Sequence, residues 1–170
     1  YLKKASLSWD ESQLSNSKHE LVNPDFIEDR CEHLHSKLSQ LVAQYSKHAS
    51  LSDFDDSVYS YCVPEISDDG ICSYPDKLAE KPYCLDSVLG EASIANLRLL
   101  HVLNDLVEFA YTELGTDWLG VYRRFVKPEN PTLVKLAYRG IPSRAEFPIT
   151  EEFAKNSNNS TVGLKGKAVI

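Results

Sequence analysis

The most reactive side chains in this sequence belong to four cysteines: Cys31, Cys62, Cys72 and Cys84. A thiolate can act as a nucleophile, bind zinc or form a disulfide. Structural zinc sites usually take their ligands from close pairs such as C-x₂-C, and these cysteines are much farther apart. His33 and His35 lie near Cys31, but residues two apart on a helix do not share a face. Ordinary reduced thiols therefore fit the spacing better than a zinc site or a disulfide framework.

Several charged residues carry groups that can bind a ligand or transfer a proton. His101, Asp105 and Glu108 share one face of a predicted helix, but the sequence places no Ser or Cys nucleophile beside them to form a triad. Arg139 and Arg144 can bind a carboxylate or phosphate with two hydrogen bonds, although arginines more often face solvent. We therefore expect no catalytic residue and no metal ligand in this set.

Glycine and aromatic residues form a third candidate group. Trp118, Gly120 and Tyr122 alternate, so on a strand they share one face. The rings would either line a pocket in which Gly120 leaves room for a ligand, or form a core in which Gly120 relieves crowding; the core is the commoner outcome. Gly163 and Gly166 could present backbone N–H groups to an anion, but no Gly-Lys-Ser/Thr follows, which favours a structural turn.

Two amphipathic helices must position these residues. The first begins at Asn23-Pro24, because Asn is a good N-cap and Pro fits the first helical position. The second helix runs from about Leu89 to Leu114, has a broad apolar face and stops at Gly115. The apolar stripe of the first helix needs a partner, either the rest of the chain or a second copy: Ile27, Cys31, Leu34, Leu38, Leu41, Val42 and Tyr45.

The hydrophobic period changes after Gly115. Residues 118–126 and 133–138 are two largely apolar runs, and the connection at 127–132 consists of turn-forming residues. We expect an antiparallel hairpin packed on the preceding helix. Residues 50–88 are instead rich in Asp and Pro. We expect an extended segment at 58–63 that ends at Pro64. We also expect a short helix or hairpin elsewhere in this region, although the pattern does not locate it.

Composition limits the class of protein. The 170 residues are 42% hydrophobic and 25% charged, as in soluble globular proteins. The net charge is −7, and residues 1–88 hold 8 Lys and Arg against 16 Asp and Glu, which argues against nucleic-acid binding. No run reaches the roughly 20 apolar residues of a membrane span, and no signal peptide is visible, so we predict a cytoplasmic location. The absence of Met predicts that the chain is part of a larger protein.

The order of these pieces resembles the first half of a GAF domain, over about residues 89–170. The long helix is followed by Asp117-Trp-Leu-Gly-Val-Tyr122, the hairpin, and Gly163-x-x-Gly166-x-Ala168, and the nearest branch contains the free methionine-R-sulfoxide reductases. The resemblance implies an α/β (α+β) fold, with an antiparallel sheet on a long helix that is incomplete unless further strands are supplied. It also implies a ligand pocket walled by Trp118, Tyr122, Tyr138, Arg144, Gly163 and Gly166.

The redox cysteines of that branch are missing. The reductases place them after the second strand and around the glycine segment, but residues 141–170 contain no Cys, so this stretch cannot attack a sulfoxide sulfur. We therefore predict a regulatory or sensory small-molecule-binding module at 89–170, preceded by an acidic, helix-containing segment at 1–88, with no cofactor indicated. Two alternatives stay open: a reductase-like enzyme that uses an upstream cysteine such as Cys84, and a module that dimerises through Ile27, Leu34, Leu38, Leu41 and Tyr45.

Overall fold

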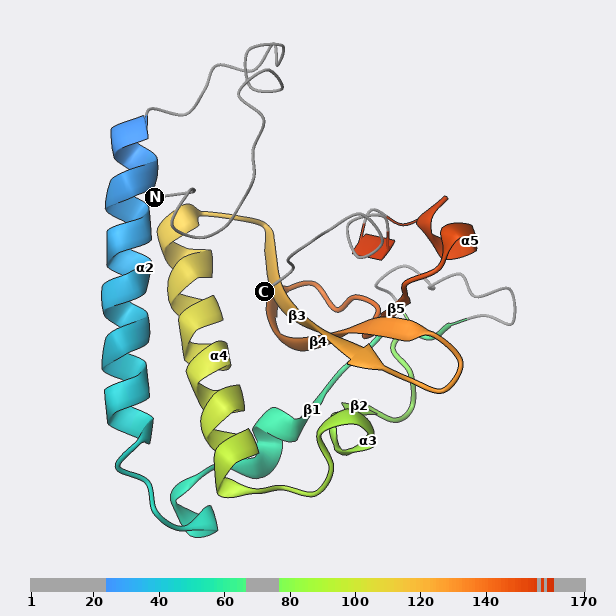
Figure 1. The fold of residues 1–170 in the computed structure, drawn as a ribbon, viewed down its shortest axis with the longest axis horizontal. Helices are drawn as coiled ribbons and strands as arrows, with labels where there is room; N and C mark the ends of the chain where they lie inside the picture. The colour runs from blue at the N-terminus through green and yellow to red at the C-terminus, as the bar shows by residue number, and fades with distance from the viewer. Residues whose placement is uncertain (1–23, 67–76, 156, 158, 161–170) are drawn as a thin grey trace.

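The chain has the α+β fold that the sequence predicts. The computed structural model describes residues 24–66 and 77–155, together with 157, 159 and 160 (Figure 1). Two long helices, α2 (Pro24–Tyr45) and α4 (Ile94–Leu114), lie side by side. An antiparallel sheet packs against α4, and its strands follow the order β3 (Trp118–Val126), β4 (Pro131–Gly140) and β5 (Glu146–Pro148).

The partner of the apolar stripe on α2 is α4 of the same chain. Leu41 is 3% exposed at this contact, whereas Leu38 is 36% exposed. Arg30 forms an ion pair with Glu113 at one end of the helix pair. At the other end, Arg98 donates to the backbone carbonyls of residues 45 and 48, both at 3.0 Å. These bonds satisfy carbonyls that the helix end leaves without intrahelical partners. The predicted cap Asn23 lies outside the described residues.

Helix α4 begins later than the sequence predicts. The expected start at Leu89 is wrong, because a separate short helix, α3 (Asp86–Leu89), ends there. Gly90 then has φ +75, a left-handed value that breaks the helix, and the Ser93 side chain accepts a hydrogen bond from the Asn96 N–H as the N-cap of α4. The predicted stop is confirmed, since Gly115 has φ +58 after Leu114.

Residues 50–88 contain short elements, as expected. They are η1 (Leu51–Asp53), η2 (Asp56–Tyr59), β1 (Ser60–Tyr61), β2 (Tyr83–Cys84) and α3, and β1 pairs antiparallel with β2. The extended segment predicted at 58–63 is only partly correct. The Asp55 side chain accepts from the Ser57 N–H and starts a helical turn through Tyr59, which leaves two residues for the strand. Pro64 does not end the pairing either, because it forms an isolated bridge with Leu78.

The predicted hairpin is confirmed. Strands β3 and β4 pair antiparallel from Trp118↔Gly140 to Val126↔Pro131. The connection is two residues shorter than expected, because β4 already begins at Pro131, and Pro is tolerated at the first position of a strand. After β5, Thr150 caps the short helix α5 (Glu151–Ala154) by accepting from the Phe153 N–H.

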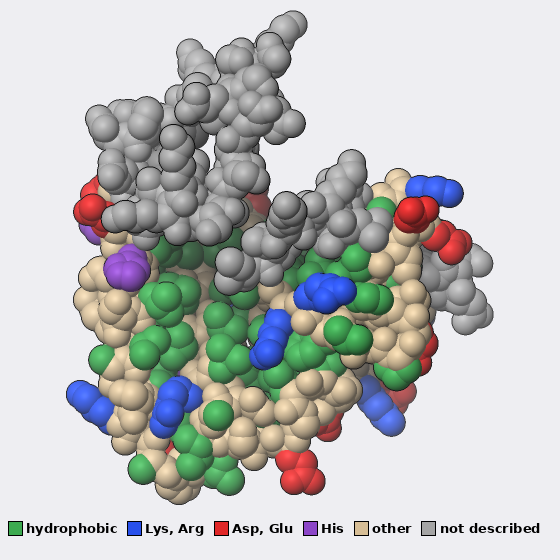
Figure 2. Space-filling model, viewed as in Figure 1, with side chains coloured by type: hydrophobic (Ala, Val, Ile, Leu, Met, Phe, Trp, Pro, Cys, Tyr) green, Lys and Arg blue, Asp and Glu red, His purple; other side chains and the backbone are tan. Residues whose placement is uncertain are grey.

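One hydrophobic core joins the early and late parts of the chain. Leu97 and Leu100 of α4 pack with Val134 and Leu136 of β4, and the segment before α4 adds two further members, Tyr59 and Leu85. On the face shown in Figure 2, the lysine and arginine side chains of the described residues stand apart from one another. Within the described part of the chain, no helix combines the length and apolar character that a membrane span requires.

The packing of α2 on α4 predicts that alanine substitutions at two neighbouring positions change the free energy of unfolding by very different amounts. Leu41→Ala should lower the free energy of unfolding by about 2–5 kcal/mol, because it removes a buried side chain and leaves a cavity. Val42→Ala is the matched control, since Val42 is 48% exposed and should change the same quantity by about 0.5 kcal/mol or less. Urea unfolding of both variants measures this. Equal losses would show that α2 does not dock on α4 in solution.

Candidate functional site

Strand β4 carries one extra residue. Val121 pairs with Ala137 but Tyr122 pairs with Lys135, so Leu136 has no partner across the ladder. Such a bulge shifts the alternation of side chains between the two faces of a strand. Tyr138 therefore lies on the same face as Lys135, although three positions separate them, and its ring centroid is 3.9 Å from the Lys135 Nζ. Arg139 turns the other way and bonds α4 through Glu108 and Asn104.

Three of the predicted wall residues meet on one face of the sheet. The Trp118 ring centroid lies 6.3 Å from that of Tyr122 and 6.3 Å from that of Tyr138. Tyr61 of β1 joins them, with its ring centroid 5.5 Å from that of Tyr138. We call these four residues the aromatic face. The predicted common orientation of Trp118, Gly120 and Tyr122 on β3 is confirmed.

The room left by Gly120 is occupied by Trp118. A Cβ at Gly120 would overlap the six-membered ring of that side chain. The indole N–H donates to the Ile141 carbonyl at 3.1 Å and holds the ring in place. Gly120 thus makes room for the Trp118 side chain, which supports the second explanation, relief of crowding.

A buried lysine lies at the centre of the aromatic face. Lys135 is 0% exposed, and its Nζ donates to the carbonyl of Ser143 at 2.7 Å and to the Ser143 Oγ at 2.9 Å. The same nitrogen lies 5.1 Å from the Tyr61 ring centroid and 5.8 Å from that of Trp118. Lysine is almost never fully buried without such compensation. The sequence analysis did not single out this residue, although a lysine in the middle of the apolar run 133–138 could have indicated a buried polar group.

The tyrosine hydroxyls tie this face to its surroundings. Tyr61 donates to the Lys135 carbonyl at 2.6 Å, and Tyr138 donates to the Cys62 carbonyl at 3.2 Å. Burial raises the pKa of Tyr122 to about 12, and a hydrogen bond with the Ser143 side chain opposes the increase. Burial also raises the pKa of Tyr61 and Tyr138 above the usual tyrosine value. All three phenols are therefore neutral near pH 7.

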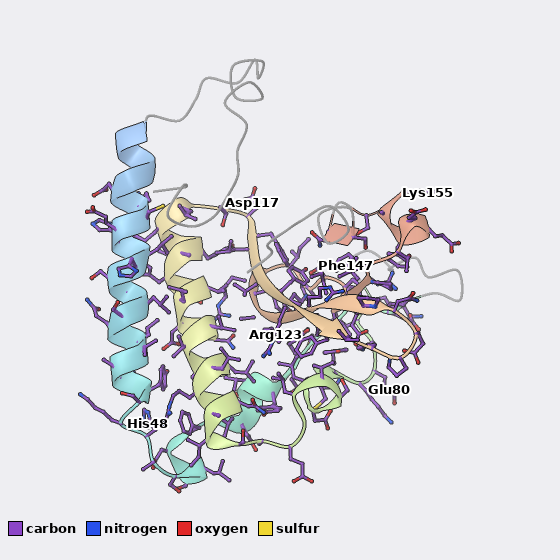
Figure 3. All side chains as sticks on the ribbon, viewed as in Figure 1. His48, Glu80, Asp117, Arg123, Phe147 and Lys155 are labelled. Atoms are coloured by element: carbon purple, nitrogen blue, oxygen red, sulfur yellow. The ribbon has the colours of Figure 1, made fainter. Side chains whose placement is uncertain are left out.

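The other predicted wall residues are placed differently. The Arg144 Nε donates to the Glu146 carbonyl at 2.8 Å, and its guanidinium lies over the Phe153 ring at 4.7 Å. These contacts direct Arg144 toward β5 and α5. Phe147, labelled in Figure 3, reaches the aromatic face from β5, with its ring centroid 5.7 Å from that of Tyr122. Gly163 and Gly166 lie outside the described residues.

A cleft of about 490 Å³ lies between the segment 57–61, helix α4 and the end of β4. We call it the α4 cleft. His101 lines the cleft and links α4 to the turn before η2, because the His101 Nε2 is 2.8 Å from the Asp55 carbonyl oxygen. Its lining combines apolar, hydroxyl and charged side chains: Ser57, Val58, Ser60, Tyr61, His101, Asn104, Asp105, Leu136, Ala137, Tyr138, Arg139 and Gly140.

The described cysteines are free thiols. Cys31 is half-buried, and Cys62 and Cys84 are exposed. Cys72 lies outside the described residues. Where the structure describes the chain, His, Cys, Asp and Glu side chains do not gather in a group of three that would hold a metal ion. The candidate sites in the described part of the molecule therefore consist of aromatic and hydrogen-bonding groups.

Comparisons of this chain with protein-family models, curated proteins and solved structures find no match.

The raised pKa of Tyr122 predicts a loss of stability at alkaline pH. Because the folded chain holds this pKa at about 12 against an ordinary value of 10.0, its contribution is fully present below pH 10 and is lost as the pH rises toward 12. Tyr122→Phe should therefore weaken the fall in unfolding free energy across that window. Urea unfolding at a series of pH values measures the slope, and Tyr111→Phe on α4 serves as control. Parallel slopes for the wild type and Tyr122→Phe would contradict the prediction.

Proposed function

We propose that residues 89–170 form a regulatory or sensory small-molecule-binding module of the GAF type. The ligand binds at the aromatic face formed by Trp118, Tyr122, Tyr138 and Tyr61. Binding changes the relative populations of two conformations, by an amount set by the difference in ligand affinity between them.

The order of elements supports this proposal. A long helix, α4, is followed by an antiparallel hairpin that packs on it, and then by a third short strand. This is the arrangement that the resemblance to the first half of a GAF domain implies. A shared fold does not determine function, however, so the proposal depends on the site itself.

The observation that carries the proposal is the buried ammonium group of Lys135. Removing a charged group from water is costly, and an apolar side chain of similar size is often neutral or stabilising in its place. A sheet that served only as a core would gain nothing from a lysine at this position. The hydrogen bonds to Ser143 and the surrounding rings hold the amine in a fixed position on the aromatic face. We infer that its charge orients an anionic or polar group of the ligand.

Lys135→Met tests this proposal. The variant keeps the length and apolar stem of the side chain but removes the charge, so it should fold with unchanged or higher stability and lose ligand affinity. Native mass spectrometry of the full chain should show a retained small molecule in the wild type and none in the variant. Lys81→Met, at an exposed site, is the matched control and should retain the molecule.

Two outcomes would contradict the proposal. One is a bound molecule of the same mass in wild type and Lys135→Met. The other is a wild-type chain that carries no bound molecule and binds none when it is titrated with the metabolite extract of its expression host.

A reductase-like enzyme remains a second candidate, because one cysteine lies beside the aromatic face. The Cys62 carbonyl accepts the Tyr138 hydroxyl, and Cys62 is exposed. Cys84, the residue proposed for this role from the sequence, instead pairs with Ser60 on the short β1–β2 ribbon. In this alternative the Cys62 thiolate attacks the sulfur of a bound sulfoxide, the S–O bond breaks as the oxygen passes to Cys62 as a sulfenic acid, and the thioether leaves. An external thiol then reduces the sulfenic acid to the thiol and releases water.

Activity measurements separate this candidate from the first. With free methionine sulfoxide and a thiol reductant, the enzyme hypothesis predicts turnover that Cys62→Ser abolishes and Cys84→Ser retains. Absence of turnover in the wild type, or equal turnover in both variants, would exclude Cys62 as the nucleophile.

The proposed homodimer has less support. Leu41 is buried against α4, and Leu34 and Tyr45 are half-buried, so these residues are largely used within the chain. Leu38 remains exposed, and the side chain of Ile27 lies outside the described residues. A dimer through the whole predicted stripe would require α2 to leave α4.

A further inference from the structure

The α4 cleft brings one carboxylate and one guanidinium to the same cavity. Asp105 comes from α4 and Arg139 from the end of β4, and both line the cleft. Arg139 reaches this position because the bulge at Leu136 reverses the alternation of the strand. A negative carboxylate on α4 and a positive guanidinium on β4 give the cavity a dipolar character.

Hydrogen bonds to neighbouring side chains hold both charged groups in place. The Tyr45 hydroxyl of α2 donates to the Asp105 Oδ2 at 2.8 Å. Arg139 donates through Nε to Glu108 and through Nη1 to the Asn104 Oδ1. Among the described residues, no hydrogen bond engages the Asp105 Oδ1 or the Arg139 Nη2. Each group therefore keeps one atom for a ligand while its orientation is fixed.

Part of the lining of the cleft is apolar. Val58 of η2 and the bulge residues Leu136 and Ala137 of β4 line this part of the cleft, and both bulge residues are nearly fully buried. A short hydrocarbon chain would lie against this surface and exclude water from it. The volume of about 490 Å³ falls in the range of small-molecule sites.

We propose that the α4 cleft binds a small zwitterion, with its ammonium on Asp105, its carboxylate on Arg139 and its hydrocarbon chain over Leu136. A molecule with a single charge fits less well. A lone ammonium leaves the Arg139 Nη2 without an acceptor, because the ion pair with Glu108 uses Nε, and a lone carboxylate leaves Asp105 without its cation. This site shares Tyr61 and Tyr138 with the aromatic face, but its two charged groups, Asp105 and Arg139, are separate from Lys135.

A matched set of compounds tests the proposed ligand class. Ligand-detected NMR titrations of the full chain would compare γ-aminobutyrate with butylamine and butyrate, which each lack one of its charges. Glycine and ε-aminocaproate extend the test to shorter and longer separations of charge. The tightest zwitterion should bind on the order of tenfold or more tightly than either singly charged compound, as expected for one additional charge-assisted contact. Equal affinities for all compounds, or no binding of any zwitterion, would overturn the proposal.

Asp105→Asn assigns the binding to this cleft. The amide oxygen can still accept the Tyr45 hydroxyl, so packing is kept while the negative charge is lost. Affinity for the zwitterion should fall about tenfold, to the level of butyrate. Glu108→Gln is the control, because it weakens a partner of Arg139 outside the cleft lining and should leave affinity equal or higher.

Lys135→Met separates this proposal from the sensory function proposed above. The variant should still prefer the zwitterion over butylamine and butyrate, because it keeps Asp105 and Arg139, even if it loses the ligand of the aromatic face. A zwitterion that binds Asp105→Asn normally but fails to bind Lys135→Met would instead belong to the aromatic face and would overturn the assignment to the α4 cleft. Circular dichroism of each variant confirms that the helices remain folded.

Discussion

The unpaired residue Leu136 is the constraint on which both candidate sites depend. In a regular strand Lys135 and Tyr138 would lie on opposite faces, because side chains alternate with a period of two. The bulge brings them together on the aromatic face and sends Arg139 to α4. A single extra residue thus distributes the charges of β4 between two surfaces: the ammonium of Lys135 goes to one and the guanidinium of Arg139 to the other. Bulges are common beside functional sites for this reason.

The burial of Lys135 has an energetic consequence for the sheet. Every residue from Thr132 to Ala137 is buried, so the lysine amine has little water available to it. Ser143 supplies two acceptors, and the π faces of Tyr138 and Tyr61 supply favourable electrostatic contact. This compensation holds the amine in one position, which is the property that a binding group requires. An apolar residue there is often neutral or stabilising, and this difference is the physical basis of the function proposed for this face.

The sequence predicted those features that follow from regular periodicity. Helical spacing located α2 and α4, and turn chemistry located the hairpin between β3 and β4. The errors arose where periodicity is broken by a local event. The start of α4 was misplaced because the positive φ of Gly90 and the Ser93 cap competed with a continuous apolar pattern. The bulge could not be predicted, since nothing in the letters Leu-Val-Lys-Leu-Ala-Tyr marks an insertion. Because the contact between Lys135 and Tyr138 depends on the bulge, it could not be predicted either.

Residues 50–88 have a larger role than their irregular pattern suggested. Tyr59 and Leu85 belong to the core on which α4 and β4 pack. Tyr61 contributes a ring to the aromatic face, and Val58 contributes to the lining of the α4 cleft. Because the elements are short, the hydrogen bonds of Asp55 and His101 fix their position in place of a long ladder. Neither candidate site is therefore complete within residues 89–170 alone, because the irregular segment supplies part of each.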